Sequence, residues 1–184
     1  MPENIIERAP ESATVEAVVV GAGVAGLYAV HRLRQLGFTN IVGIEAGDGV
    51  GGTWYWNRYP GCRCDVPTIE HSYSFDEDLE QEWSFGEVMS GQPEIETYLN
   101  HVADRFDLRR DFRFSTRVTE ATFDETSERW IVETDHGDRF VAQWCVMATG
   151  SLSAPNLPPI DGIESFAGTV VHTGDWKFDF HPVG

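Results

Sequence analysis

Apolar residues are grouped into runs and helical periods over the first part of the chain, and they predict a strand–helix–strand unit. Residues 15–20 form a short β-branched run without polar alternation, which is typical of a buried parallel strand. Residues 27–36 carry apolar side chains at helical spacing, and residues 40–45 form a second apolar run that ends in an acid. The polar, mostly acidic residues 1–14 are predicted to be a flexible arm.

The middle of the chain shows a different succession of patterns. Residues 67–90 are acidic and aromatic at irregular spacing, so we expect loops and short helical turns there. A helix is predicted over residues 93–108, because Pro93 suits a first helical position and the later apolar residues share one face. The segments that follow predict a small antiparallel β-meander, formed by residues 118–123, 130–134 and 139–146. The apolar residues 144–147 are interpreted as a buried strand before a tight glycine turn.

A glycine-rich turn, Gly-Ala-Gly-Val-Ala-Gly, joins the first predicted strand to the first predicted helix. Gly21 permits the tight turn, Gly23 lets the backbone approach a pyrophosphate, and Gly26 lets the helix pack closely on the strand. The helix N-terminus offers free N–H groups and a positive dipole to phosphates. Glu45 ends the second strand, where its carboxylate can accept hydrogen bonds from ribose and would repel a ribose phosphate. The whole pattern predicts a dinucleotide site that prefers FAD or NAD to NADP.

Residues 51–65 combine large aromatic side chains with glycine, arginine and aspartate directly after this unit. Loops rich in rings and glycine commonly press on a flat ligand, because functional loops are presented by a rigid scaffold. The alternative is an aromatic loop folded back onto its own core. For Asp65 the alternative is a turn-capping side chain after the glycines.

Composition narrows the class of protein. The chain has 184 residues and a formal net charge of −17, which argues against nucleic acid and anionic membranes as partners. The sequence shows no secretory signal and no apolar run long enough to span a bilayer. Cys62, Cys64 and Cys145 fit neither a disulfide framework nor a zinc pattern, so we interpret them as unpaired thiols in a reducing cytoplasm and predict no metal site. A thiol–disulfide oxidoreductase would need two cysteines separated by two residues, and the spacing of Cys62 and Cys64 is different.

Two longer motifs resemble one known family. The Gly-Gly-x-Trp-x-x-x-x-Tyr-Pro-Gly-x-x-x-Asp signature of Baeyer–Villiger monooxygenases is matched at every fixed position, by Gly51, Gly52, Trp54, Tyr59, Pro60, Gly61 and Asp65. The family's second signature, Phe-x-Gly-x-x-x-His-x-x-x-Trp, is similar to the segment that contains Phe166, Gly168, His172 and Trp176. The order of glycine turn, aromatic loop, helix, meander and Ala-Thr-Gly resembles that of flavoproteins with two dinucleotide-binding domains.

The resemblance implies an α/β fold with a Rossmann-like FAD-binding domain at residues 15–150. This domain would have a parallel sheet with helices and an inserted small antiparallel β-meander. Residues 151–184 would form a linker or hinge toward an NADPH-binding domain, and His172 would belong to this hinge rather than act as an acid or base. The implied activity is that of an oxidoreductase that uses FAD, NADPH and O₂ to convert ketones to esters or lactones. In such enzymes the cofactor carries the chemistry and the protein orients it.

The resemblance also implies roles for single residues. The implied FAD-binding residues are Gly21, Gly23, Gly26, Glu45, Gly52, Thr53, Trp54, Asp65 and Val118, whose backbone matches an adenine contact. Thr53 and Trp54 are expected along the flavin. Asp65, the candidate catalytic residue, matches an active-site acid that orients a catalytic arginine, and we expect it to be buried beside that arginine. Arg63 and Cys64 match positions that could contact NADP.

The NADPH fingerprint and the catalytic arginine of the resembled family lie outside this sequence. We therefore expect a second polypeptide that carries the NADPH and substrate half, in a cytoplasmic heterodimer, and a truncated product or fragment is the alternative. The expected substrates are a small-molecule ketone and O₂. Two other functions stay open at this point: a flavin monooxygenase that oxidises nitrogen or sulfur atoms, and a non-catalytic FAD-binding module or inactive fragment.

Overall fold

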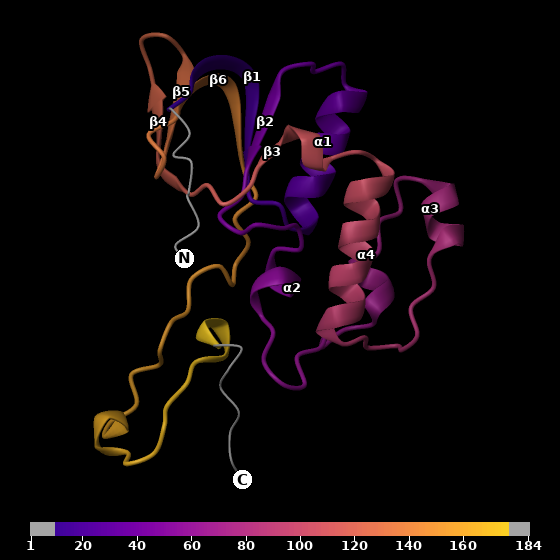
Figure 1. Cartoon of the computed structure of the whole chain (residues 1–184), viewed down its shortest axis with the longest axis vertical. Helices are drawn as coiled ribbons and strands as arrows, with labels where there is room; N and C mark the ends of the chain where they lie inside the picture. The colour runs from indigo at the N-terminus through magenta and orange to yellow at the C-terminus, as the bar shows by residue number, and fades with distance from the viewer. Residues whose placement is uncertain (1–9, 177–184) are drawn as a thin grey trace, which may run out of the picture.

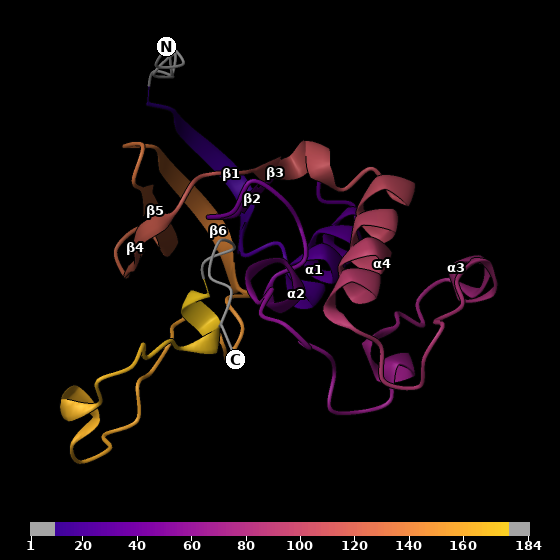
Figure 2. The same ribbon diagram turned by 60° about the horizontal axis from the view of Figure 1, so that its bottom comes forward.

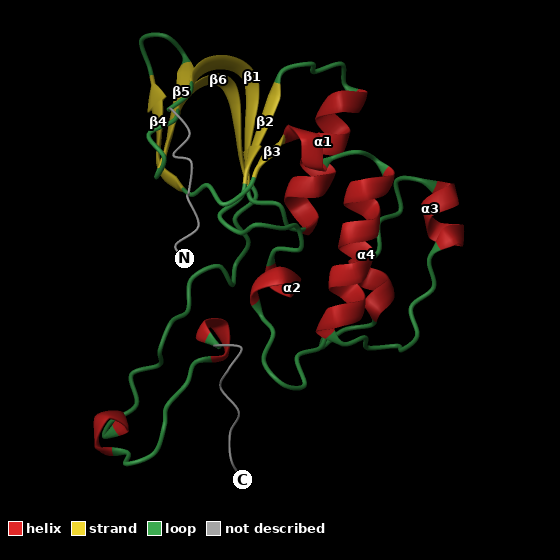
Figure 3. Cartoon of the chain, in the orientation of Figure 1, coloured by secondary structure: helices red, strands yellow, loops and turns green. Residues whose placement is uncertain are grey.

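One six-stranded sheet forms the centre of the computed structural model, which describes residues 10–176 (Figures 1 and 3). The strands are β1 (Ser12–Val20), β2 (Ile41–Ile44), β3 (Phe112–Arg113), β4 (Val118–Asp124), β5 (Arg129–Thr134) and β6 (Arg139–Met147). Their order across the sheet is β3-β2-β1-β6-β5-β4. The sheet is mixed, because β3, β2, β1 and β6 pair in parallel while β6, β5 and β4 pair antiparallel.

Helices of very different length connect these strands. The α-helices are α1 (Val24–Gln35), α2 (Thr53–Trp56), α3 (Glu77–Glu82) and α4 (Gln92–Arg105). Single 3₁₀ turns are η1 (Thr68–His71), η2 (Arg109–Asp111), η3 (Ile163–Ser165) and η4 (Thr173–Asp175). The two long helices, α1 and α4, lie side by side next to the sheet in Figure 1. Local signals set the helix starts: Asp76 caps α3 by accepting the N–H of Leu79 at 2.8 Å, and α4 has a proline in its first turn.

Both faces of β1 are covered, which explains its unbroken apolar sequence. Val19 belongs to a core that also contains residues of the two long helices: Leu27, Val30, Ile95, Leu99 and Val102. Val18 and Val20 belong to a second core, in which residues of β2 and the meander meet: Val42, Ile44, Val132, Phe140 and Ala142. Successive side chains of a strand point to opposite faces, so neighbouring valines serve different cores. The α/β fold class and the inserted meander predicted from the sequence are confirmed.

The structure differs from the sequence prediction in the role of β6. Residues predicted as a meander strand and as a separate final strand form one continuous strand, which pairs with β1 along its length. The predicted burial of its last residues is wrong, because Trp144 is 54% exposed and Met147 is 56% exposed. The physical reason is the register: β5 pairs with β6 only as far as Ala142, and beyond it β1 is the only described strand beside β6. The first strand also begins at Ser12 rather than at residue 15, and residues 1–9 of the predicted arm lie outside the described part.

The segment after β6 runs away from the body of the molecule (Figure 2). Five of its apolar side chains are 50% to 65% exposed, and they are Leu152, Leu157, Ile160, Phe166 and Val170. This described segment, residues 149–176, therefore contributes little to either core. The predicted linker at residues 151–184 is described only as far as Trp176.

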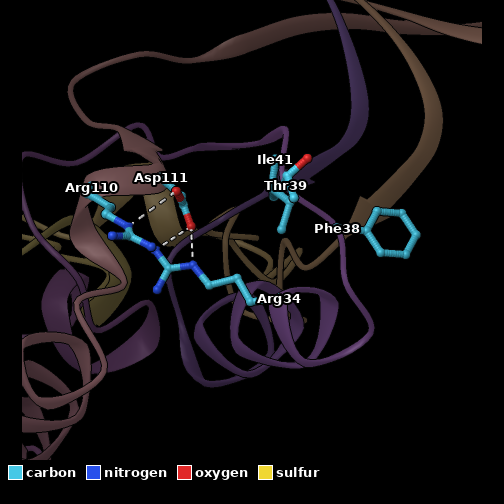
Figure 4. A pocket seen from close by; sticks show the side chains of 6 residues that line it. All are labelled: Arg34, Phe38, Thr39, Ile41, Arg110 and Asp111. Carbon is cyan, nitrogen blue, oxygen red and sulfur yellow. Dashed lines mark hydrogen bonds and ion pairs between the residues drawn. The ribbon is translucent and has the colours of Figure 1, made fainter.

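Arg34, near the C-terminal end of α1, ties this helix to the loop after α4 (Figure 4). Its Nε donates to Asp111 Oδ2 at 2.6 Å, and its terminal nitrogens donate to the carbonyl oxygens of Phe106 at 2.9 Å and Asp107 at 2.8 Å. Arg34 and Asp111 also line a cavity of about 350 Å³ together with Phe38, Thr39, Ile41 and Arg110. The cavity lies at the opposite end of α1 from the glycine turn, and its arginines are engaged with carboxylates. We assign this cluster a structural role.

We predict that Arg34→Leu lowers the free energy of unfolding by about 1–3 kcal/mol, because it leaves two carbonyl groups without their charged donor and Asp111 with only its longer ion pair to Arg110, at 4.0 Å. Urea unfolding followed by circular dichroism measures the change. Arg32→Leu is the matched control, since Arg32 is exposed and donates, among the described residues, only to Gln35 of its own helix, and its effect should stay within about 0.5 kcal/mol. Equal effects of the two substitutions would contradict the prediction.

Candidate functional site

Main chain packs directly on main chain where β1 enters the glycine-rich turn. Gly21 has a φ of +103°, and its N–H donates to the carbonyl oxygen of Ile44 at 2.8 Å. A Cβ atom on Gly21 would lie 2.5 Å from the carbonyl oxygen of Ala148, and one on Gly26 would lie 1.8 Å from the carbonyl oxygen of Gly21. Glycine is therefore required at both positions, and α1 starts in contact with the turn.

The N-terminus of α1 is open to an anion. Its N-cap is Gly23, which makes no side-chain cap, and the first turn contains no acidic residue. The first N–H groups of a helix have no partner within the helix and carry the positive end of its dipole. Gly52, in the aromatic loop, packs against Gly23: a Cβ atom on Gly23 would lie 3.2 Å from the Cα of Gly52. This bare backbone cradle fits a pyrophosphate, for which side chains would leave no room.

Glu45 braces the same cradle. Its side chain is buried at 5% exposure, and its two oxygens accept the N–H of Ala22 and the N–H of Gly47, each at 2.7 Å. The carboxylate thus connects the glycine turn to the loop after β2, which the sequence pattern did not reveal. Acceptance of ribose hydroxyls by Glu45 remains a prediction.

The aromatic loop begins with the single helical turn α2. Gly52, at φ +55°, precedes it, Thr53 is exposed, and Trp54 is buried at 7% exposure in the core shared with the helices. The Trp54 ring meets the His71 ring edge-on, at 5.4 Å between centroids, and the Nδ1 of His71 is buried without a hydrogen-bond partner. The burial of Trp54 agrees with the alternative that the loop folds back onto its own core. Contact of Thr53 and Trp54 with a flavin stays a prediction.

Residues 62–65 form an extended segment that separates inward from outward side chains. An isolated bridge between Arg63 and Gly91 fixes it, so Cys62 and Cys64 are buried while Arg63 and Asp65 are exposed. Asp65 is not buried within this chain, because alternation in extended backbone turns its side chain to the surface, and its burial beside an arginine from outside the chain stays a prediction. Arg63 instead pairs with Glu87 at 3.0 Å.

The neighbourhood of Asp65 includes Tyr59 and Cys62. The pKa of Tyr59 is raised, chiefly by its hydrogen bond with Cys62, then by burial, and further by the negative charge of Asp65. Burial also raises the pKa of the Cys62 thiol. Both groups stay protonated at neutral pH, so neither of them adds a negative charge beside Asp65.

The remaining predicted site residues lie in two other places. Val118 is half-buried at the start of β4, where a register shift follows it. In the segment after β6, Phe166 is 63% exposed, and a Cβ atom on Gly168 would lie 2.6 Å from its ring. The Nδ1 of His172 accepts the N–H of Gly174 at 3.0 Å and thereby caps η4. This contact agrees with a structural role for His172, while its proposed part in a hinge is untested.

The last residues of the described segment return to the aromatic loop. Trp176 lines a cavity of about 390 Å³ together with Asp48, Tyr55, Trp56, Arg58, Gly174 and Asp175. The aromatic loop and Trp176, the last residue of the second motif, are thus brought together in space, although more than a hundred residues separate them.

Neither a metal centre nor a membrane-spanning helix is present in the part of the chain that the structure describes. Residues 10–176 contain no group of three or more histidine, cysteine, aspartate or glutamate side chains that could hold a metal ion. No helix among them is long and apolar enough to cross a membrane. Cys62, Cys64 and Cys145 are free thiols, as predicted.

The geometry of a strand, a glycine cradle and an open helix N-terminus is matched by a known family. Residues 18–183 match the family described as pyridine nucleotide-disulphide oxidoreductase. The chain belongs to this family. Its family name refers to disulphide chemistry, but the cysteines of this chain are unpaired.

Curated relatives narrow the comparison. The chain is 47% identical over 163 residues to an acetone monooxygenase (methyl acetate-forming) of Gordonia sp. and 44% identical over 164 residues to a Baeyer-Villiger monooxygenase of Pseudooceanicola batsensis. Each alignment covers 89% of this chain but 30% of the relative. The chain thus spans about a third of the length of the curated relatives that it matches, and it corresponds to their FAD-binding region.

Solved structures agree with this correspondence. A steroid monooxygenase bound to NADP matches with a TM-score of 0.81 and 56% identity, and a closed cyclohexanone monooxygenase matches with a TM-score of 0.83 and 47% identity. Both matches cover 92% of this chain and 32% of the other chain. The resemblance to Baeyer–Villiger monooxygenases found in the sequence is confirmed, and with it the Rossmann-like fold.

We predict that Glu45→Gln lowers the free energy of unfolding by about 1–3 kcal/mol, because an amide can accept only one of the two buried N–H groups and its NH₂ would face the other. Chemical denaturation measures the loss. Glu133→Gln serves as the control, since that side chain is 47% exposed and should change stability by no more than about 0.5 kcal/mol. A Glu45 variant as stable as the control would show that the carboxylate does not brace the cradle.

Proposed function

We propose that this chain is the FAD-binding part of an NADPH- and O₂-dependent monooxygenase that converts ketones to esters or lactones. The observation that carries the proposal is the backbone cradle of Gly23 and Gly52 at the open N-terminus of α1. The names of the relatives, which include an acetone monooxygenase and a cyclohexanone 1,2-monooxygenase, support this reaction class.

The residues of the cradle fit FAD in a simple division of labour. The N–H groups at the start of α1 bind the pyrophosphate, Glu45 holds the turn and accepts from the adenosine ribose, and the backbone of Val118 contacts adenine. Thr53 and Trp54 set the position of the flavin from α2. When bound, FAD supplies the redox chemistry with NADPH and O₂, while this chain binds it, orients it and excludes water.

Asp65 is proposed to orient an arginine that is supplied from outside this chain. Its exposed position on an extended segment supports this, because the carboxylate is accessible to a side chain that docks on the loop. A carboxylate fixes a guanidinium group in a planar fork, and the fixed charge can then stabilise a developing oxyanion on the substrate. For NADPH, Arg63 offers a half-exposed side chain, whereas Cys64 is buried and its N–H donates to Ser90, so any contact of Cys64 is through its remaining backbone atoms.

A second polypeptide with the NADPH and substrate half is part of the proposal. The outer edge of β6 beyond Ala142 supports it, because backbone groups there lack a described strand partner and Trp144 and Met147 are exposed beside them. An unpaired edge with apolar neighbours is a site where another strand readily adds. The exposed apolar side chains after β6 offer a further contact surface. The cytoplasm, where free thiols persist, is the proposed location.

One comparison favours a second candidate function. A phenazine N-monooxygenase of Lysobacter antibioticus is 40% identical to the chain over 164 residues, so oxidation of a nitrogen atom is the alternative reaction. A third hypothesis is an FAD-binding module without turnover, which predicts flavin binding without NADPH consumption.

We predict that Gly23→Ala weakens FAD binding by roughly tenfold, equivalent to about 1.4 kcal/mol, because the new methyl group occupies the cradle and must shift the backbone of Gly52. Gly23 has a φ of −84°, so alanine causes no backbone strain and the effect reports close approach alone. Titration of FAD fluorescence measures the affinity. Gly91→Ala is the control, since a Cβ atom there makes only ordinary contacts and φ is −70°. Unchanged affinity in the Gly23 variant would exclude the cradle as the pyrophosphate site.

Native mass spectrometry of the protein from its own source tests the partner. We expect a complex of the 20.6 kDa chain with a larger polypeptide, a flavin absorbance spectrum, and NADPH oxidation that depends on a cyclic ketone. NADPH oxidation with a phenazine but not with ketones would favour the alternative reaction. A single colourless species of 20.6 kDa would contradict the heterodimer.

A further inference from the structure

The start of α4 is joined to the backbone of α2 by a buried polar side chain. Gln92 is 6% exposed, and its amide nitrogen donates both to the carbonyl oxygen of Trp54 and to Glu96 Oε2, the latter at 2.7 Å. Buried amides are seldom tolerated without such partners, and here both N–H bonds of the amide are used. The contact spans 38 residues of sequence, so it fixes tertiary rather than local structure.

The same network holds the next carbonyl of α2. Glu96 forms an ion pair with Arg58, whose Nε donates to the carbonyl oxygen of Tyr55 at 2.9 Å. The Arg58 guanidinium also lies over the Tyr55 ring, 5.1 Å from its centroid. The last carbonyl groups of a helix have no partner within it, and in a helix of one turn this affects nearly every residue. Gln92 and Arg58 therefore satisfy two carbonyl groups, those of Trp54 and Tyr55, that α2 does not satisfy itself.

The side chain of Tyr55 connects α2 to the loop that precedes it. Three glycines pack against its side chain: Cβ atoms on Gly47 and Gly49 would lie 2.6 and 3.2 Å from its ring, and one on Gly51 would lie 3.0 Å from its Cβ. Its hydroxyl donates to Asp48 Oδ1 at 2.6 Å and accepts the N–H of Asp48 at 3.2 Å. The loop thus has little freedom to move without α2.

We propose that Gln92 and Glu96 are positioning residues, which set α2 against the glycine turn and thereby fix where the flavin lies; this inference rests on the proposed function. Neither residue reaches the cradle itself. They act through the backbone of Trp54 and Tyr55, whose helix begins directly after Gly52. No sequence motif indicated this role, because a glutamine and a glutamate one turn apart are common on any helix surface.

The test uses Gln92→Leu, Glu96→Gln and the control Thr97→Ala in the protein as isolated with any polypeptide that accompanies it. Thr97 is exposed and bonds only to Pro93 of its own helix. Three quantities are measured for each variant: the unfolding temperature, the FAD dissociation constant, and the visible circular dichroism of bound FAD, which reports the surroundings of the flavin ring. We expect Gln92→Leu to raise the dissociation constant on the order of tenfold and Glu96→Gln by a smaller factor, because only the former leaves a carbonyl of α2 without a partner.

Both variants should also alter the visible circular dichroism of bound FAD, whereas Thr97→Ala should not. If Gln92→Leu fails to fold, Glu96→Gln decides, since its ion pair is partly exposed and its loss is mild. Folded variants that bind FAD with unchanged affinity and unchanged circular dichroism would overturn the positioning role, even if their unfolding temperature falls. A parent protein that binds no FAD would instead overturn the proposed function itself.

Discussion

The contact of three backbone segments around the glycine-rich turn is the constraint on which the rest of the structure depends. Gly21 meets Ala148 after β6, Gly26 meets Gly21, and Gly23 meets Gly52. At each contact the distance leaves no room for a side chain, so the end of β1, the start of α1 and the aromatic loop are fixed relative to one another. The buried carboxylate of Glu45 strengthens this point, because it accepts one N–H group from the glycine turn and one from the loop after β2. A pyrophosphate site is the direct consequence of this geometry.

The long strand β6 connects this point to the meander. The strand pairs in parallel with β1 along its whole length, and its first half also pairs antiparallel with β5. It therefore joins the parallel and the antiparallel parts of one sheet. The two cores on either side of β1 follow from this arrangement. The same arrangement leaves the second half of β6 without a described neighbour on its outer edge. In our proposal, the same further polypeptide covers this edge of the sheet and supplies the remaining part of the active site.

In the aromatic loop, tertiary contacts decide which of the side chains are buried and which are exposed. Its rings do not simply form a surface for a flat ligand: Trp54 is packed in the core, and glycines pack against the side chain of Tyr55. What remains available at the loop is backbone and the side chains that stay exposed, which include Thr53, Arg63, Asp65 and the ring of Trp56 at 47% exposure. This distribution favours a role in which buried side chains hold the loop and its exposed part contacts the cofactor.

The sequence by itself determined the elements whose signals are local. Apolar runs, helical spacing and the glycine turn predicted β1, α1, β2, α4 and the meander, and the two motifs identified the resembled family. Only the tertiary structure decided which side chains of these elements are buried. Asp65 is exposed because a bridge between Arg63 and Gly91 makes its segment extended, and Trp144 is exposed because the pairing of β5 with β6 stops at Ala142. Such outcomes depend on pairing between distant segments, and no periodicity within a single segment encodes the register of its partner.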